Sequence, residues 1–119
     1  MKHNYENLEI YKRSLIVSVE IMKIIDDLRP YRLAEQVVSS SISIPSNIAE
    51  GAERPSEKDF IKFLGYASGS AAELITQLNI IQLSGKRIDL DLPKLIAELK
   101  EINAMIRRFI ERLSKEVNT

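Results

Sequence analysis

Two groups of side chains in this sequence have the chemistry to act on a ligand. The first comprises three polar residues in otherwise apolar helical segments, Asn47, Glu50 and Glu73. Carboxylates can act as general acids or bases and can coordinate metal ions. The alternative is structural, because buried polar groups need partners: Asn47 and Glu50 would hydrogen-bond the adjoining helix ends and fix the turn. We favour the structural interpretation.

The second group is basic and lies in the last third of the chain. It comprises Lys86 and Arg87 in a loop, and Arg107, Arg108, Arg112 and Lys115 near the C-terminus. Steps of four and three residues place Arg108, Arg112 and Lys115 on one helix face. Such a face can bind phosphates, and copies of it in an oligomer would act together. Cations are also stabilised at a helix C-terminus, and Arg107 can pair with Glu111, so a solvated, stabilising face is the favoured interpretation.

Common catalytic motifs are missing from the sequence. It has no Cys, and its one His is His3, near the N-terminus. A di-iron bundle needs Glu-x-x-His pairs, a helical ribonuclease of the Arg-x(4–6)-His type needs a His at that spacing, and Ser or Cys nucleophiles need a base. Neither of the glycine-rich phosphate-binding motifs, G-x-x-x-x-G-K-[ST] and G-x-G-x-x-G, occurs in the sequence. We therefore predict a protein that is not an enzyme and uses no metal or cofactor.

Composition points to one domain, residues 1–119, in the cytoplasm. Lys plus Arg and Asp plus Glu both number 17, and this neutral balance argues mildly against nonspecific nucleic-acid binding, which relies on a basic excess. No apolar run approaches the roughly 20 residues of a membrane span, and no signal-peptide pattern is present. The absence of Cys fits a reducing compartment. We expect no membrane partner.

Apolar residues recur at steps of three and four along nearly the whole chain. The pattern predicts helices at about 7–28, 31–50, 57–83 and 91–116. Pro30 marks the first connection, Ser56 is placed to cap the third helix, Gly85 to end it, and Asp89 or Asp91 to cap the fourth. Short connections between long helices favour an all-α, antiparallel, up-down-up-down four-helix bundle.

The second helix carries two expected irregularities. Gly51 occupies the position where a helix would end in a left-handed cap. Pro45 lies inside the helix, where it removes one backbone donor, so we expect a kinked but continuous helix. Neighbouring hydroxyls can satisfy the freed backbone groups. These belong to Ser39, Ser40, Ser41 and Ser43.

The third helix has the most regular repeat in the chain, which predicts a bundle seam. The seam consists of Phe60, Leu64, Ala67, Ala71, Leu74, Leu78 and Ile81. Beside it runs a strip of small residues, Gly65, Ser68, Gly69 and Ala72. Each glycine costs about 1 kcal/mol of helix propensity relative to alanine. We expect close packing of a neighbouring helix to offset that cost; a ligand that approaches the backbone is the alternative.

The first helix has two apolar stripes, which is more than a monomeric bundle requires. One contains Leu8, Tyr11, Leu15, Met22 and Ile25, and the other Ile10, Val17, Ile21, Ile24 and Leu28. A polar ridge that includes Arg13 and Glu20 separates them on the far side. The second stripe predicts an oligomer, unless it only widens the intramolecular core.

The sequence also resembles a known family, the small proteins encoded in intervening sequences of bacterial 23S ribosomal RNA genes. The resemblance rests on Ser43-Ile44-Pro45-Ser46-Asn47-Ile48-Ala49-Glu50-Gly51, followed by Phe60, Phe63-Leu64 and Gly69-Ser70-Ala71-Ala72-Glu73-Leu74, after an opening Glu6-Asn7-Leu8-Glu9-Ile10-Tyr11. It covers nearly the whole chain. The residues shared with the family motif are expected to be structural: Pro45, Asn47, Ile48, Ala49, Glu50, Gly51, Gly69 and Glu73.

The resemblance implies an antiparallel four-helix bundle that assembles as a homopentamer and whose cellular role is undefined. One related branch assists the reverse transcriptases of diversity-generating retroelements through a basic surface that binds nucleic acid and the polymerase; this neutral chain differs from it. We therefore expect a non-enzymatic, homo-oligomeric scaffold or adaptor with a protein partner. The alternative is a binder of structured RNA or DNA that uses the basic group.

Overall fold

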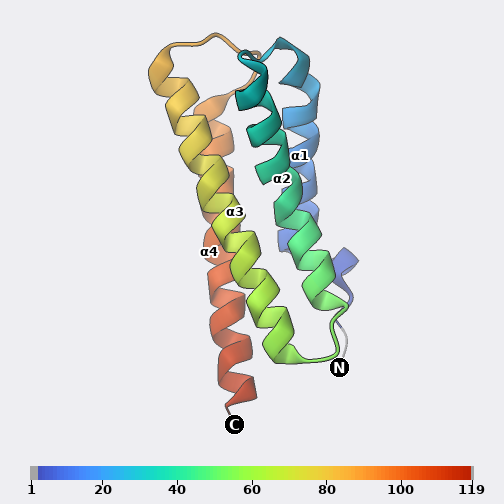
Figure 1. The fold of residues 1–119 in the computed structure, drawn as a ribbon. Coiled ribbons are helices and arrows are strands. Elements are labelled where there is room, and N and C mark those ends of the chain that lie inside the picture. The colour runs from blue at the N-terminus through green and yellow to red at the C-terminus, as the bar shows by residue number, and fades with distance from the viewer. Residues whose placement is uncertain (1–2, 119) are drawn as a thin grey trace.

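The computed structural model describes residues 3–118, which form four long helices (Figure 1). Met1, Lys2 and Thr119 of the predicted domain lie outside the described residues. The helices are α1 (Glu9–Ile24), α2 (Tyr31–Ala52), α3 (Glu57–Ser84) and α4 (Leu92–Val117), with short 3-10 helices η1 (Tyr5–Asn7) and η2 (Ile25–Asp27). No strand occurs in this range. The prediction of an all-α protein with four helices is confirmed.

The four helices lie side by side in an elongated molecule of 50 × 21 × 20 Å. In Figure 1 the loop between α2 and α3 lies at the lower end, where the described chain also begins. The loops that join α1 to α2 and α3 to α4 lie at the upper end. Segments far apart in the sequence therefore meet along the helix flanks and at these two ends.

Local signals in the sequence set most of the helix boundaries. The Ser56 hydroxyl accepts a hydrogen bond from the Asp59 amide at 3.1 Å, and Asp91 accepts one from the Lys94 amide at 3.1 Å. Gly85 ends α3 in the left-handed conformation, with φ 75°. These predictions are confirmed. The first helix is shorter than predicted, because α1 ends at Ile24 and a 3-10 turn follows.

The expected role of Gly51 is wrong. The residue lies inside α2, which continues to Ala52, and Gly85 is the residue with positive φ among residues 3–118. Gly51 is instead buried against the start of α3. A Cβ atom there would lie 2.6 Å from Phe63 Cβ and 2.9 Å from a Phe60 ring carbon. The glycine is needed because the two helices approach closely at this point.

The core consists of apolar stripes from all four helices. The predicted seam of α3 is confirmed, since each of its seven members is buried. In α1 the stripe of Ile10, Val17, Ile21 and Ile24 is buried. Fully burying one such side chain stabilises the fold by about 1.5–3 kcal/mol. The other α1 stripe is not absorbed in the same way, because Leu15 and Met22 remain exposed.

The α2 helix continues through Pro45. One backbone carbonyl of α2 loses its donor to this proline and is hydrogen-bonded by another helix instead. Pro45 cannot donate to the Ser41 carbonyl four residues earlier. The Ser18 hydroxyl of α1 donates to that carbonyl at 3.0 Å. The expectation that hydroxyls of α2 itself would do so is wrong: Ser41 bonds Val38, and other α2 hydroxyls face α3.

Candidate functional site

The basic residues near the C-terminus lie on the surface of the last turns of α4. Arg107, Arg108, Arg112 and Lys115 are all exposed. The Arg112 guanidinium lies 4.8 Å from the centre of the Phe109 ring, a cation–π contact that holds it near the helix surface. Lys115 pairs with Glu111 at 3.6 Å, so the expected Arg107–Glu111 pair is not the one formed. Arg108, Arg112 and Lys115 form the α4 basic face.

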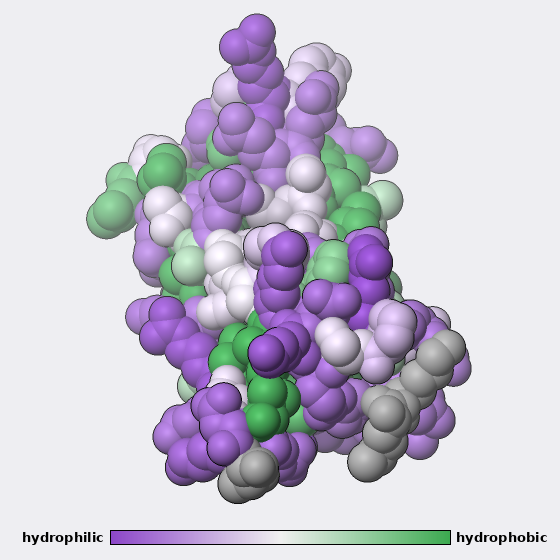
Figure 2. All heavy atoms as spheres, turned by 60° about the horizontal axis from the view of Figure 1, so that its bottom comes forward, coloured by the Kyte–Doolittle hydropathy of each residue, from purple (hydrophilic) through white to green (hydrophobic). Residues whose placement is uncertain are grey.

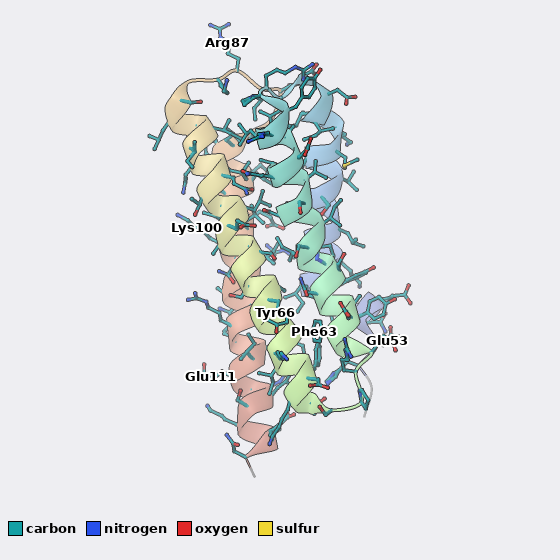
Figure 3. The ribbon with its side chains drawn as sticks, viewed as in Figure 1. Glu53, Phe63, Tyr66, Arg87, Lys100 and Glu111 are labelled. Atoms are coloured by element: carbon teal, nitrogen blue, oxygen red, sulfur yellow. The ribbon has the colours of Figure 1, made fainter. Side chains whose placement is uncertain are left out.

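The structure does not bring the two parts of the predicted basic group together. Lys86 and Arg87 lie in the loop that precedes α4, whereas the α4 basic face lies near the other end of that helix. Figure 3 shows Arg87 at the upper end and Glu111, which neighbours the basic face, in the lower half. Twenty helical residues at 1.5 Å each separate Leu92 from Arg112, or about 30 Å. One chain therefore presents two small cationic surfaces.

A shallow depression adjoins the α4 basic face. It has a volume of about 440 Å³ and lies between the start of α1 and the last turns of α4. Arg108 and Arg112 line it together with Glu9, and the apolar side chains of Met105 and Phe109 form part of its wall. Glu9 places a carboxylate beside the two guanidinium groups. The depression is thus electrostatically mixed.

The three polar residues of the second and third helices take part in local hydrogen bonds. Asn47 donates to the Ser43 carbonyl at 2.8 Å, one turn back in α2, so the expectation that it would fix the turn is wrong. Glu50 accepts from Arg54 at 3.1 Å at the end of α2. Glu73 accepts from the Ser40 hydroxyl at 2.7 Å, which joins α3 to α2. Structural contacts therefore engage all three.

No cluster of acidic, His or Cys side chains suited to a metal ion occurs among residues 3–118. Glu50 and Glu73 lie on different helices and are engaged by Arg54 and Ser40, respectively. The family-motif residues Ile48, Ala49 and Gly69 do not supply metal-binding atoms from their side chains. The described structure offers these carboxylates no shared centre.

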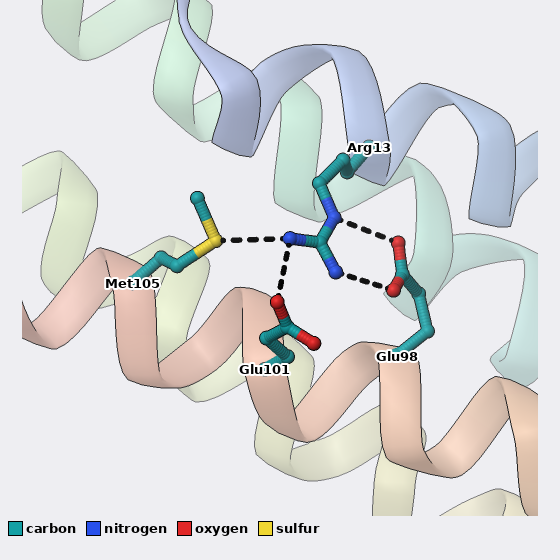
Figure 4. A network of polar contacts seen from close by, with 4 residues as sticks. All are labelled: Arg13, Glu98, Glu101 and Met105. Carbon is teal, nitrogen blue, oxygen red and sulfur yellow. Dashed lines mark hydrogen bonds and ion pairs between the residues drawn. The ribbon is translucent and has the colours of Figure 1, made fainter.

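The strongest polar network was not predicted from the sequence. Arg13 of α1 reaches across to α4, where its Nε donates to Glu98 at 2.9 Å and its Nη1 donates to Glu101 at 3.0 Å (Figure 4). A second Arg13 bond makes the contact with Glu98 bidentate, and Met105 Sδ lies 3.3 Å from Nη1. Hydrogen bonds from Arg13 lower the pKa of both Glu98 and Glu101. Both carboxylates are held ionised as parts of a clamp between α1 and α4.

The only histidine, His3, packs against α3 and α4 at the lower end of the molecule. His3 Nε2 lies 2.8 Å from Glu57 Oε1, at the start of α3. Its ring centre is 4.6 Å from that of Phe60 and 5.8 Å from that of Phe109. The segment before α1 is thereby fastened to α3 and α4. The sequence pattern gave no signal for this contact, because His3 precedes the periodic region.

Large apolar side chains are also exposed on two flanks of α1. Leu15 and Met22, one turn before and after Ser18, lie on the flank next to α2, Ile16 lies on the flank next to α4, and Val19 lies between the two flanks. On α3, Gly65 and Gly69 face open space, with no atom within 4 Å of a Cβ built on either. No other helix among residues 3–118 therefore packs closely on these two glycines, and the close helix packing expected of the strip stays a prediction. No helix among residues 3–118 is long and apolar enough to cross a membrane.

These features define a four-helix, all-α protein with cationic and apolar surfaces. The chain belongs to the family of 23S rRNA-intervening sequence proteins, whose family model matches residues 6–108. Among solved structures, it is similar to a protein of unknown function from the S23 ribosomal protein family of Bacteroides thetaiotaomicron VPI-5482. The TM-score is 0.79 at 24% identity, over 85% of this chain and 97% of that one, which supports the fold. None of the curated proteins compared with the chain matches it.

Proposed function

We propose that this chain is the subunit of a non-enzymatic homo-oligomer that acts as a scaffold or adaptor. In this proposal each subunit is an antiparallel, up-down-up-down bundle, and the closed assembly is a pentamer, as the family resemblance implies. The surfaces of the bundle, rather than a catalytic centre, then perform the function. The observation that carries the proposal is an apolar flank that the chain leaves uncovered.

We call this surface the α1–α2 flank and define it by Leu15, Met22 and Ile42. These residues are 39%, 52% and 45% exposed. Leu15 and Met22 lie one turn before and after Ser18, which contacts α2. Ser40 faces α3, so Ile42, two residues further on, faces the opposite side of α2. Large apolar side chains exposed on one flank favour a protein–protein contact.

The outer face of α3 offers a complementary surface. Gly65, Gly69 and Ala72 are exposed and have little or no side chain, so they let another helix approach closely. In a ring, each copy meets its neighbours through two different surfaces. Contact between the α1–α2 flank of one copy and the α3 strip of the next would cover both. This arrangement also accounts for the glycines, which cost helix propensity without an intramolecular benefit. Figure 2 shows apolar side chains, in green, that reach the surface in separate patches between polar ones.

The test is size-exclusion chromatography with light scattering. We expect the wild-type chain to have the mass of a pentamer. Met22→Lys should reduce that mass, because the lysine would have to be desolvated in the contact. Ile16→Lys is the matched control, since Ile16 is equally apolar and exposed but lies on the other flank of α1. Gly69→Leu should also dissociate the assembly. A monomeric wild-type protein, or equal masses for all variants, would contradict the proposal.

A second candidate function is binding of structured RNA or DNA, which the α4 basic face favours. Its three cations share one exposed face, and a ring would repeat that face in every subunit. Replacing Arg108, Arg112 and Lys115 with Gln should weaken binding of a structured ribosomal RNA fragment and flatten its salt dependence. Replacing Lys86 and Arg87 with Gln, at the other end of the molecule, tests the second cationic surface separately. Unchanged affinity and salt slope in the triple variant would dismiss the α4 basic face.

A further inference from the structure

A groove runs between α1 and α4 on the flank of α1 that faces away from the proposed subunit contact. It has a volume of about 590 Å³, and its lining extends along α4 from Leu90 to Glu101. The clamp from Arg13 to Glu98 and Glu101 lies at one end (Figure 4). From the N-cap residue Asp91 to Glu101 the α4 side of the lining spans ten residues, or about 15 Å, which corresponds to nearly three turns of a helix laid alongside.

The floor of the groove is apolar. Val17 and Leu95 form its buried base, while Ala97 lines the wall from α4. Ile16 is 61% exposed, although the next residue of α1, Val17, is buried. An isoleucine that projects from the edge of an apolar groove offers an anchor for another side chain. The shape and lining match those of grooves that bind amphipathic helices.

The rim of the groove carries an excess of negative charge. Four carboxylates line it, from Glu20, Asp91, Glu98 and Glu101, whereas Lys94 is the cation in the lining. Arg13 adds a second cation but is fully engaged by two of the carboxylates, and its hydrogen bonds lower the pKa of both. The ion pair of Glu20 with Lys23 is exposed and therefore weak. When Arg13 and Lys23 are both counted with Lys94, the four carboxylates exceed the three cations by one.

We propose that the α1–α4 groove binds a basic amphipathic helix of about three turns from a partner protein. The apolar face of that helix would lie on Ile16 and the floor, and its Lys or Arg residues would face Glu20 and the exposed edges of Glu98 and Glu101. Charge complementarity selects this occupant, because an acidic helix would meet the same rim with repulsion. The proposal specifies the partner class for the adaptor role and rests on that role, but not on oligomerisation.

The probe is a synthetic, fluorescently labelled helical peptide of about 14 residues, enough for three turns in the groove and about half a turn at each end, with Leu at one face and Lys elsewhere. A matched peptide has Glu in place of every Lys. Fluorescence anisotropy against the full chain should show saturable binding of the Lys peptide, weaker at high salt, and no binding of the Glu peptide. Ile16→Lys should reduce affinity for the Lys peptide by about tenfold or more, because it removes the apolar anchor and adds a like charge.

Two further variants separate this proposal from oligomer formation. Met22→Lys, on the other flank of α1, should keep wild-type affinity for the peptide while it changes the mass of the assembly. Glu20→Lys leaves the floor of the groove intact and should weaken binding of the Lys peptide through charge alone. Ile16 and Glu20 are not core residues, and circular dichroism would verify that both variants fold.

Three outcomes would overturn the proposal. If neither peptide binds, the groove is not a helix-binding site. If both peptides bind equally, or Met22→Lys weakens binding as much as Ile16→Lys, the contact is a nonspecific one with the α1–α2 flank. If Ile16→Lys lowers the mass of the assembly, a second copy of the chain covers the groove. The adaptor role itself would survive the last outcome.

Discussion

The Ser18 hydroxyl lies 3.0 Å from the Ser41 carbonyl and supplies the donor that Pro45 takes away from α2. Both serines are buried, so water does not readily replace this bond. The same hydroxyl lies 3.2 Å from the Ser14 carbonyl of its own helix. A proline inside α2 is thus tolerated because α1 carries a hydroxyl at the matching height, which also fixes how the two helices are aligned.

We predict that Ser18→Ala lowers the free energy of unfolding by about 1–3 kcal/mol, since it leaves a buried carbonyl unpaired. In a Pro45→Ala background, the restored amide donates to the Ser41 carbonyl, and the same substitution should cost less. Urea unfolding of the four proteins measures the coupling, which we expect to be about 1 kcal/mol.

Ser114→Ala provides the control for this cycle. The Ser114 hydroxyl bonds the Ile110 carbonyl of its own helix, where no proline removes the backbone donor. It should change stability by no more than about 0.5 kcal/mol. Equal losses for Ser18→Ala in both backgrounds would refute the link to Pro45.

Gly51→Ala and Gly69→Ala should have opposite effects on stability. At Gly51 the added Cβ would lie 2.6 Å from Phe63 Cβ, so the helices must shift, at a cost of about 1–3 kcal/mol. At Gly69 the added methyl meets no atom within 4 Å, and the gain in helix propensity is about 0.5–1 kcal/mol. Thermal unfolding in the Met22→Lys background removes the proposed subunit contact from the comparison. Stabilisation by both substitutions would show that α2 and α3 can separate at Gly51 without cost.

Much of the fold could be predicted because its signals are local. The step of three and four residues locates each helix, and Ser56, Gly85 and Asp91 act on backbone groups within a few residues. The role of Gly51 could not be found in this way. A glycine that ends a helix and one that admits a neighbouring ring look the same along the chain, and only the position of Phe63 distinguishes them.

The candidate surfaces were harder to predict, because they depend on which helix flanks face each other. Arg13 stands 85 residues before Glu98 in the chain, and nothing in either segment identifies the other as its partner. The separation of Arg87 from Arg112 was accessible in principle, since a helix of known length lies between them. The two apolar stripes of α1 did indicate an uncovered surface, and Leu15 and Met22 are indeed exposed.

The clamp between α1 and α4 should make stability depend on pH in the acid range. Arg13 lowers the pKa of Glu98 from its ordinary value of 4.5, so the folded state binds a proton less readily than the unfolded chain. The stabilisation is therefore present above about pH 4.5 and is lost as pH falls through the lowered pKa. Glu98→Gln should cost about 1 kcal/mol at neutral pH, a modest figure because solvent screens this partly exposed pair.

The difference in urea midpoint between the wild-type chain and Glu98→Gln should therefore shrink steadily as pH falls below about 4.5 and through the lowered pKa of Glu98. Glu111→Gln is the matched control, because the Glu111–Lys115 pair is more than two-thirds exposed on both sides. That variant should stay near the wild type at every pH, since such pairs contribute little. A constant difference for Glu98→Gln across the range would mean that its carboxylate stabilises the fold through packing and not through the charge held by Arg13.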